Sequence, residues 1–91
     1  MTDVDGEACY AIAPGHRLQW EEAQQAWVVL YPEGMVKLND SAAEILQRCD
    51  GKTTLTALTT DLETAFGETD LADDVAQLVS AAVEHGWLVR R

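Results

Sequence analysis

The chain has 91 residues, of which 47% are hydrophobic, and its formal net charge is −10. This length predicts a single domain with one modest core, and the apolar content excludes a disordered chain. Sixteen acidic against six basic residues also oppose binding to the phosphates of a nucleic acid.

The amino-terminal segment has the composition of an arm. Residues 1–16 are mostly small and polar, and Pro14-Gly15 marks a turn. We therefore expect a flexible or loosely docked arm over residues 1–16 and a single domain over residues 17–91. The acidic start lacks the basic and then apolar plan of a signal peptide, and no apolar run approaches the length of a membrane span. These features predict a cytoplasmic protein. Its two cysteines, Cys9 and Cys49, are far enough apart in the sequence to form one disulfide, but free thiols are favoured because nothing indicates secretion.

Residues 17–38 alternate between polar and apolar side chains with the period of a strand. Residues 26–31 are apolar on both faces, which predicts the central strand of a three-stranded antiparallel meander. Pro32-Glu33-Gly34 predicts a three-residue hairpin loop, with Gly34 in a left-handed conformation. The third strand would then cover Met35 to Leu38 and form an edge of the sheet.

After Leu38 the period changes to that of a helix. The stretch "NDSAAE" offers several N-cap residues, among them a capping box at Ser41-x-x-Glu44, and Gly51 would end this first helix. A second helix is predicted from Thr53 or Thr54 to Gly67. A third is predicted over residues 70–85, followed by a tail, "WLVRR", that folds back on the core. The predicted fold class is α+β, a three-stranded antiparallel β-meander followed by three α-helices.

Residues with catalytic potential are few. The sequence has no phosphate loop, nucleophile elbow or metal-binding spacing. His16 and His85 are interpreted as surface residues, and Cys49 lies on the apolar stripe of the first helix, as a small buried hydrophobe would. We therefore predict that the protein is not an enzyme and that it holds no metal.

The third helix combines an apolar stripe with a wide apolar flank. Val75, Leu78 and Ala82 lie on the stripe, and residues such as Val79 and Val83 widen it to about half of the circumference. An open strand edge beside such a helix favours β-strand addition by a peptide. The same surface would also serve a dimer. As a separate alternative, Lys37 in an edge strand would act only as a guard against uncontrolled strand pairing.

Two segments resemble a known family. The stretch "RLQWEEAQQAWVVLYPEGMVKLNDSAAEILQRCDG" and the segment "DVAQLVSAAVEHGWL" are similar to the PqqD family of pyrroloquinoline quinone (PQQ) biosynthesis. The resemblance implies a winged-helix-like fold and a peptide-recognition domain over residues 17–91. It also implies a chaperone-like role in which the protein binds the precursor peptide PqqA and presents it to the radical S-adenosylmethionine enzyme PqqE. Members of the family carry no cofactor and do no chemistry.

The same resemblance implies that the peptide adds as a strand beside residues 35–38, against the helix at 70–85. Lys37 and Arg48 would pair with acidic groups of the precursor. The implied peptide-binding residues are Met35, Val36, Lys37, Leu38, Ile45, Val75, Leu78, Val79 and Ala82.

Two alternative hypotheses come from other classes. In the first, a structural subunit buries the same edge and helix face in a homo-oligomer, so that both monomer and homodimer stay open. In the second, a winged-helix domain binds a nucleic acid, but residues 70–85 contain no lysine or arginine to contact it. We therefore predict peptide and protein partners, and neither a nucleic acid nor a membrane.

Overall fold

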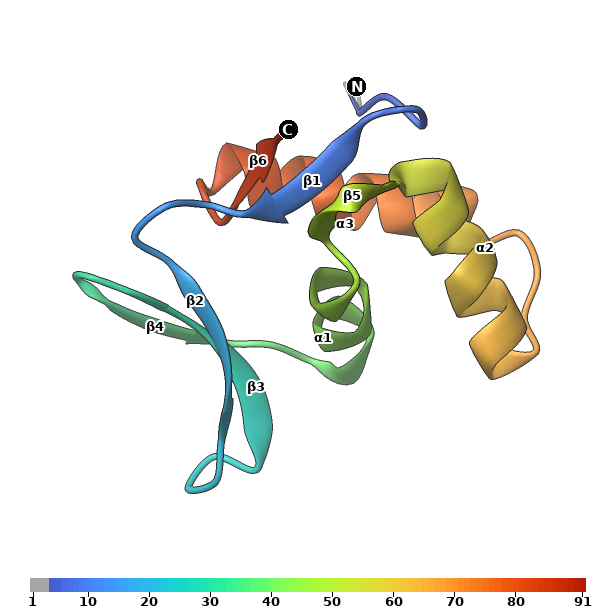
Figure 1. The fold of residues 1–91 in the computed structure, drawn as a ribbon. Coiled ribbons are helices and arrows are strands. Elements are labelled where there is room, and N and C mark those ends of the chain that lie inside the picture. Colours follow the sequence, from blue (N-terminus) through green and yellow to red (C-terminus); the bar gives the residue numbers. More distant parts are fainter. Residues whose placement is uncertain (1–3) are drawn as a thin grey trace.

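The computed structural model describes residues 4–91, and its strands form two small antiparallel sheets around three helices (Figure 1). One sheet has the strand order β2-β3-β4, and the other has the order β5-β1-β6. The elements in chain order are β1 (Cys9–Ile12), β2 (Arg17–Glu21), β3 (Ala26–Tyr31), β4 (Gly34–Lys37), α1 (Asp40–Gln47), β5 (Asp50–Thr54), α2 (Leu55–Phe66), α3 (Ala72–Glu84) and β6 (Leu88–Arg90).

The sheet β2-β3-β4 is the meander that the sequence predicts, with β3 at its centre. Alternate side chains of a strand share a face, and the paired residues Trp20 and Trp27 lie on the same face as Val29 and its partner Val36. Val29 is fully buried on this inner face. The β3–β4 connection differs from the expected three-residue loop, because Gly34 pairs with Tyr31 and does not have a positive φ.

The expectation of a flexible or loosely docked arm over residues 1–16 is wrong for residues 9–12. These residues form strand β1, which lies at the centre of the second sheet. Residues 1–3 are outside the described part of the chain. Tyr10 is only 5% exposed, and the flanking Ala8 and Ala13 are also buried. The stretch "CYAI" has no amphipathic pattern, so its strand conformation comes from pairing with β5 and β6, which lie far away in the sequence. The folded domain therefore does not begin at residue 17.

All three expected helices are present, but the first has a different cap and a different end. The side chain of Asn39 accepts a hydrogen bond from the Ala42 amide at 2.8 Å, so Asn39 is the N-cap and Ser41 is not. The helix ends at Gln47, and Gly51, at φ 78°, lies within β5 instead of ending α1. Gly67 ends α2 in the left-handed conformation, as expected.

One core joins the inner face of the meander to the helices and to the second sheet. Its most buried side chains come from β3, α1, α3 and β6, and they include Val29, Leu46, Val79 and Leu88. The carboxy-terminal tail folds back as predicted, because β6 pairs with β1 and Leu88 is 1% exposed. Among residues 4–91, no helix is long and apolar enough to cross a membrane.

Candidate functional site

Strand β4 is an edge of its sheet, since β3 is its only pairing partner within residues 4–91. The amide of Leu38 donates to the carbonyl of Trp27 at 2.9 Å. In a regular antiparallel ladder, hydrogen-bonded and non-hydrogen-bonded pairs alternate. Val36 and Gly34 therefore direct their N–H and C=O groups toward β3, whereas Met35 and Lys37 direct theirs away from the sheet. The open edge offers the backbone groups of these two residues.

The side chains of β4 alternate as well. Met35 is 44% exposed, and Lys37 is also exposed on the outer face. Val36 points to the inner face, where it is half-buried against the core, and Leu38 belongs to the core itself. No acidic side chain of the described residues forms an ion pair with Lys37. The ammonium group is thus available to a ligand that pairs with this edge.

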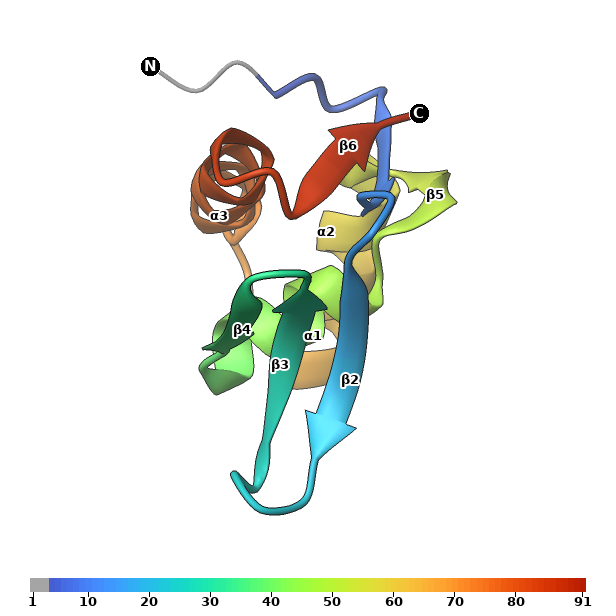
Figure 2. The ribbon, with the colours of Figure 1, turned by 90° about the vertical axis from the view of Figure 1, so that its left-hand side faces the viewer.

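Figure 2 shows β4 at the edge of its sheet on the side of α3. The apolar face of this helix is divided between core and surface. Val75, Val79 and Ala82 are at most 2% exposed and pack in the core, whereas Leu78 is half-buried and Val83 is 38% exposed. The wide apolar face therefore serves mainly to join α3 to the rest of the molecule.

The nine residues expected to bind a peptide thus fall into two groups. Met35, Val36, Lys37 and Leu78 are accessible or half-buried. The other five belong to the core and are at most 6% exposed: Leu38, Ile45, Val75, Val79 and Ala82. The sequence identified the edge strand. It did not show that the N–H and C=O groups of Met35 and Lys37 point away from the sheet, because this follows from the strand register.

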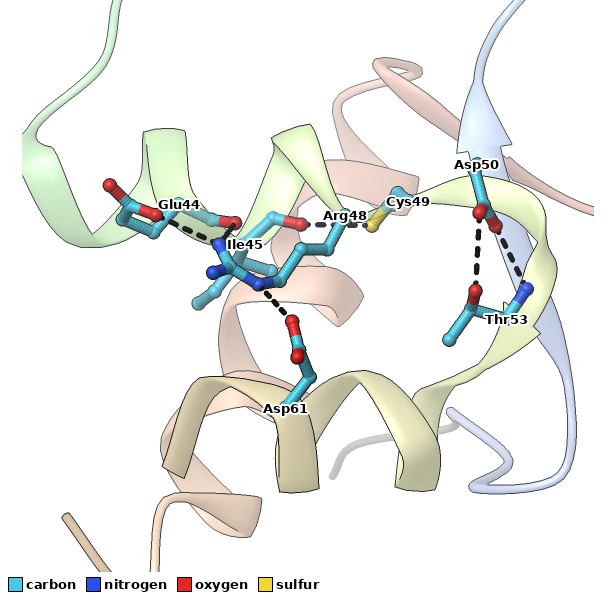
Figure 3. A network of polar contacts seen from close by, with 7 residues as sticks. All are labelled: Glu44, Ile45, Arg48, Cys49, Asp50, Thr53 and Asp61. Atoms are coloured by element: carbon cyan, nitrogen blue, oxygen red, sulfur yellow. Dashed lines mark hydrogen bonds and ion pairs between the residues drawn. The ribbon is translucent and has the colours of Figure 1, made fainter. Parts of the chain in front are cut away.

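Arg48 is already engaged within the protein (Figure 3). Its Nη1 lies 2.8 Å from Oε1 of Glu44, and its Nε lies 2.7 Å from Oδ2 of Asp61. The hydrogen bonds that the guanidinium donates to the carboxylates of Glu44 and Asp61 raise its pKa. Arg48 therefore ties α1 to α2, and this pairing argues against its expected role as a partner for acidic groups of a peptide.

Cys49 lies beside this network, and its environment is that of a structural residue. The thiol donates to the carbonyl of Ile45 at 3.4 Å, and burial followed by the charge of Asp50 raises its pKa to about 12. Asp50 itself has a lowered pKa, because the amides of Lys52 and Thr53 donate to its carboxylate. A thiol with so high a pKa is a poor nucleophile at neutral pH.

Comparisons with known proteins agree with one another. A family model described as "Coenzyme PQQ synthesis protein D (PqqD)" matches residues 26–88. A protein of Methylococcus capsulatus named "PqqA binding protein" is 44% identical over 85% of this chain and 83% of its own length. A protein of the same name from Stutzerimonas stutzeri is 44% identical over the full length of both chains.

One solved structure shares the fold. It is the solution NMR structure of the PqqD truncation of Methylobacterium extorquens PqqCD, described as a functional and stand-alone recognition element for ribosomally synthesized and post-translationally modified peptides. The TM-score is 0.81 at 24% sequence identity, over 98% of this chain and 97% of the other. At this level of identity the likeness establishes the fold of the molecule.

Proposed function

Because this chain belongs to the PqqD family, we propose that it binds the precursor peptide PqqA in PQQ biosynthesis, as the names of its relatives state for them. The proposed role is recognition without catalysis, and it includes presentation of the peptide to the radical S-adenosylmethionine enzyme PqqE. The observation that carries the proposal is the unpaired edge of β4, which offers backbone groups at Met35 and Lys37 beside α3.

The proposed mode of binding is β-strand addition at residues 35–38, against the helix predicted at 70–85, in a winged-helix-like arrangement. The peptide backbone would pair with the outward groups of Met35 and Lys37, because antiparallel pairing needs donors and acceptors in alternation. Val36 and Leu78 would contact side chains of the peptide on the inner side. The Lys37 ammonium would pair with an acidic group of the peptide. Five core residues would support β4 and α3 beneath the peptide: Leu38, Ile45, Val75, Val79 and Ala82.

A proline at position 37 tests this mode. Proline has no amide hydrogen, and it is tolerated in an edge strand where that hydrogen is not used by the sheet. We expect Lys37→Pro to weaken binding of PqqA by about tenfold or more, since one backbone hydrogen bond and the strand geometry beside it are lost. The measurement is isothermal titration calorimetry with the synthetic precursor peptide.

The control is Lys37→Gln, which keeps the backbone amide and removes only the charge. This variant should retain most of the affinity and lose part of its dependence on salt. Amide spectra of both variants would establish that they fold. A folded Lys37→Pro protein with unchanged affinity would contradict strand addition, and so would peptide-induced shifts confined to the β2–β3 hairpin of the wild-type protein.

Two alternatives use the same surface. A second copy could pair with β4, but the net charge of −10 opposes self-association, and light scattering with and without peptide would separate the cases. A nucleic-acid-binding role is disfavoured, because α3 contains Asp73, Asp74 and Glu84 and no basic residue.

A further inference from the structure

A second concave surface lies between the β2–β3 hairpin and the corner where α2 leads into α3. It is a cleft of about 640 Å³. In Figure 1 the hairpin and this corner stand on either side of α1. No residue of β4 lines the cleft, although the core residues Ile45 and Val75, which lie beneath the proposed peptide site, also border it. Its lining residues are Trp20, Trp27, Asp40, Ser41, Ala43, Glu44, Ile45, Leu62, Phe66, Glu68, Leu71, Asp74 and Val75.

Aromatic side chains from the β2–β3 hairpin and from α2 line this cleft. Phe66, at the end of α2, is 52% exposed, and Trp20, on β2, is 44% exposed. Trp20 and Trp27 meet edge to face with ring centroids 6.1 Å apart, and the indole of Trp20 donates to Glu22 at 3.0 Å. These two contacts hold the indole of Trp20 in this orientation. Exposed aromatic residues are typical anchors of protein interfaces.

The charged residues that line the cleft are all acidic. They are Asp40, Glu44, Glu68 and Asp74, and no lysine, arginine or histidine is among the lining residues. Arg48 pairs with Glu44, which leaves three carboxylates without a basic partner among the described residues. An apolar cleft with a rim of one charge fits a ligand that is apolar in the middle and positively charged at its sides.

We propose that this cleft docks a basic amphipathic segment of a partner protein, in which an apolar or aromatic side chain is flanked by lysines or arginines. The apolar side chain would insert between Trp20 and Phe66, while the flanking bases would pair with Asp40, Glu68 and Asp74. A second copy of this chain does not fit, because it carries the same net charge of −10 and only six basic residues. The protein would then hold a partner at the cleft while the edge of β4 stays open.

The test uses a synthetic amphipathic helical peptide with leucines on one face and lysines beside them. Binding is followed by fluorescence anisotropy and by the indole N–H signal of Trp20. We expect binding that weakens with salt, and about a tenfold loss of affinity in Phe66→Ala and in the double variant Glu68→Gln/Asp74→Asn. A peptide with glutamates in place of the lysines should not bind.

Matched controls lie outside the cleft. Val83→Ala also shortens an exposed apolar side chain, and Glu84→Gln removes an acid from the same helix as Asp74. Both should bind the lysine peptide as the wild-type protein does. The proposal is overturned if the lysine peptide fails to bind, if the glutamate peptide binds equally well, or if Phe66→Ala has no effect. It is also overturned if the wild-type protein is a dimer that Phe66→Ala converts to a monomer.

The β4 edge and the cleft can be tested independently. Phe66→Ala should leave binding of the precursor peptide unchanged, and Lys37→Pro should leave binding of the lysine peptide unchanged. A loss of both activities in one folded variant would show that the two surfaces are a single site, which would contradict the separate cleft.

Discussion

At the scale of single residues, Cys49 links burial to the pH dependence of stability. Its pKa is raised from the ordinary value of 9.0 to about 12, mainly by burial. The folded state therefore holds the thiol proton more tightly than the unfolded state. The stabilisation is fully present below pH 9 and is lost as the pH rises toward 12, by at most about 1.4 kcal/mol per pH unit. We expect the free energy of unfolding in urea to fall over this interval.

The variant Cys49→Ala removes this dependence and provides the comparison. It should be less stable than the wild-type protein at neutral pH, because a buried side chain is truncated, but its stability should decline less steeply above pH 9. Parallel declines in the two proteins would show that another group is responsible. Cys9 is half-buried, so the measurement is made with reductant present to keep both thiols free.

At the scale of elements, the N-cap of α1 differs between the sequence-based prediction and the structure. The sequence favours a capping box at Ser41, whereas the side chain of Asn39 accepts the hydrogen bond of the Ala42 amide. We expect Asn39→Ala to lower the free energy of unfolding by about 1 kcal/mol, which is typical for the loss of an N-cap. Ser41→Ala should change it by less than about 0.5 kcal/mol. Urea titrations of both variants measure these differences, and a larger loss at Ser41 would contradict the assignment.

Elements with a strong local period were predictable, and elements without one were not. The meander and the three helices have regular apolar spacing and turn residues, so these elements could be inferred from residues 17–85 alone. Strands β1, β5 and β6 are short, and β5 contains Asp50, Gly51 and Lys52, which are rare in strands. Their conformation depends on pairing across long distances in the sequence, which no local window contains.

The candidate site divides in the same way. The edge of β4 and the exposure of Lys37 follow from the strand order, which the sequence predicts. The burial of Val75, Val79 and Ala82 could not be predicted from the sequence. A helical wheel shows which residues share a face of α3, but it does not show that α1, α2 and β6 pack against that face. The exposure of Phe66 was also not predicted, because its spacing in the sequence is that of a buried residue. Phe66 follows Leu55, Leu58 and Leu62 at helical spacing, which predicts burial, but it lies at the end of α2 and lines the cleft, where its side chain is 52% exposed.

At the scale of the whole molecule, the position of β1 makes the amino-terminal segment part of the cooperative fold. Strands β5 and β6 pair with β1 and not with each other. The sequence alone places the domain boundary after residue 16. Removing residues 1–16 would therefore disrupt the second sheet and expose core residues such as Leu88, which pairs with Ile12. We expect the truncated chain to lose its cooperative thermal transition and the dispersion of its amide spectrum.

A point substitution tests the same idea within the full chain. Tyr10 is 5% exposed at the centre of the second sheet, so Tyr10→Ala should cost about 3–5 kcal/mol, as for other large aromatic side chains in cores. Tyr10→Phe keeps the ring and loses only the hydrogen bond that its hydroxyl accepts from the Asp5 amide at 3.3 Å, which is worth about 1 kcal/mol or less. Because a domain of this size has a stability of only about 5–15 kcal/mol, the alanine variant should unfold at a much lower urea concentration. If the truncated chain and Tyr10→Ala both unfolded as the wild-type protein does, β1 would be an attached arm after all.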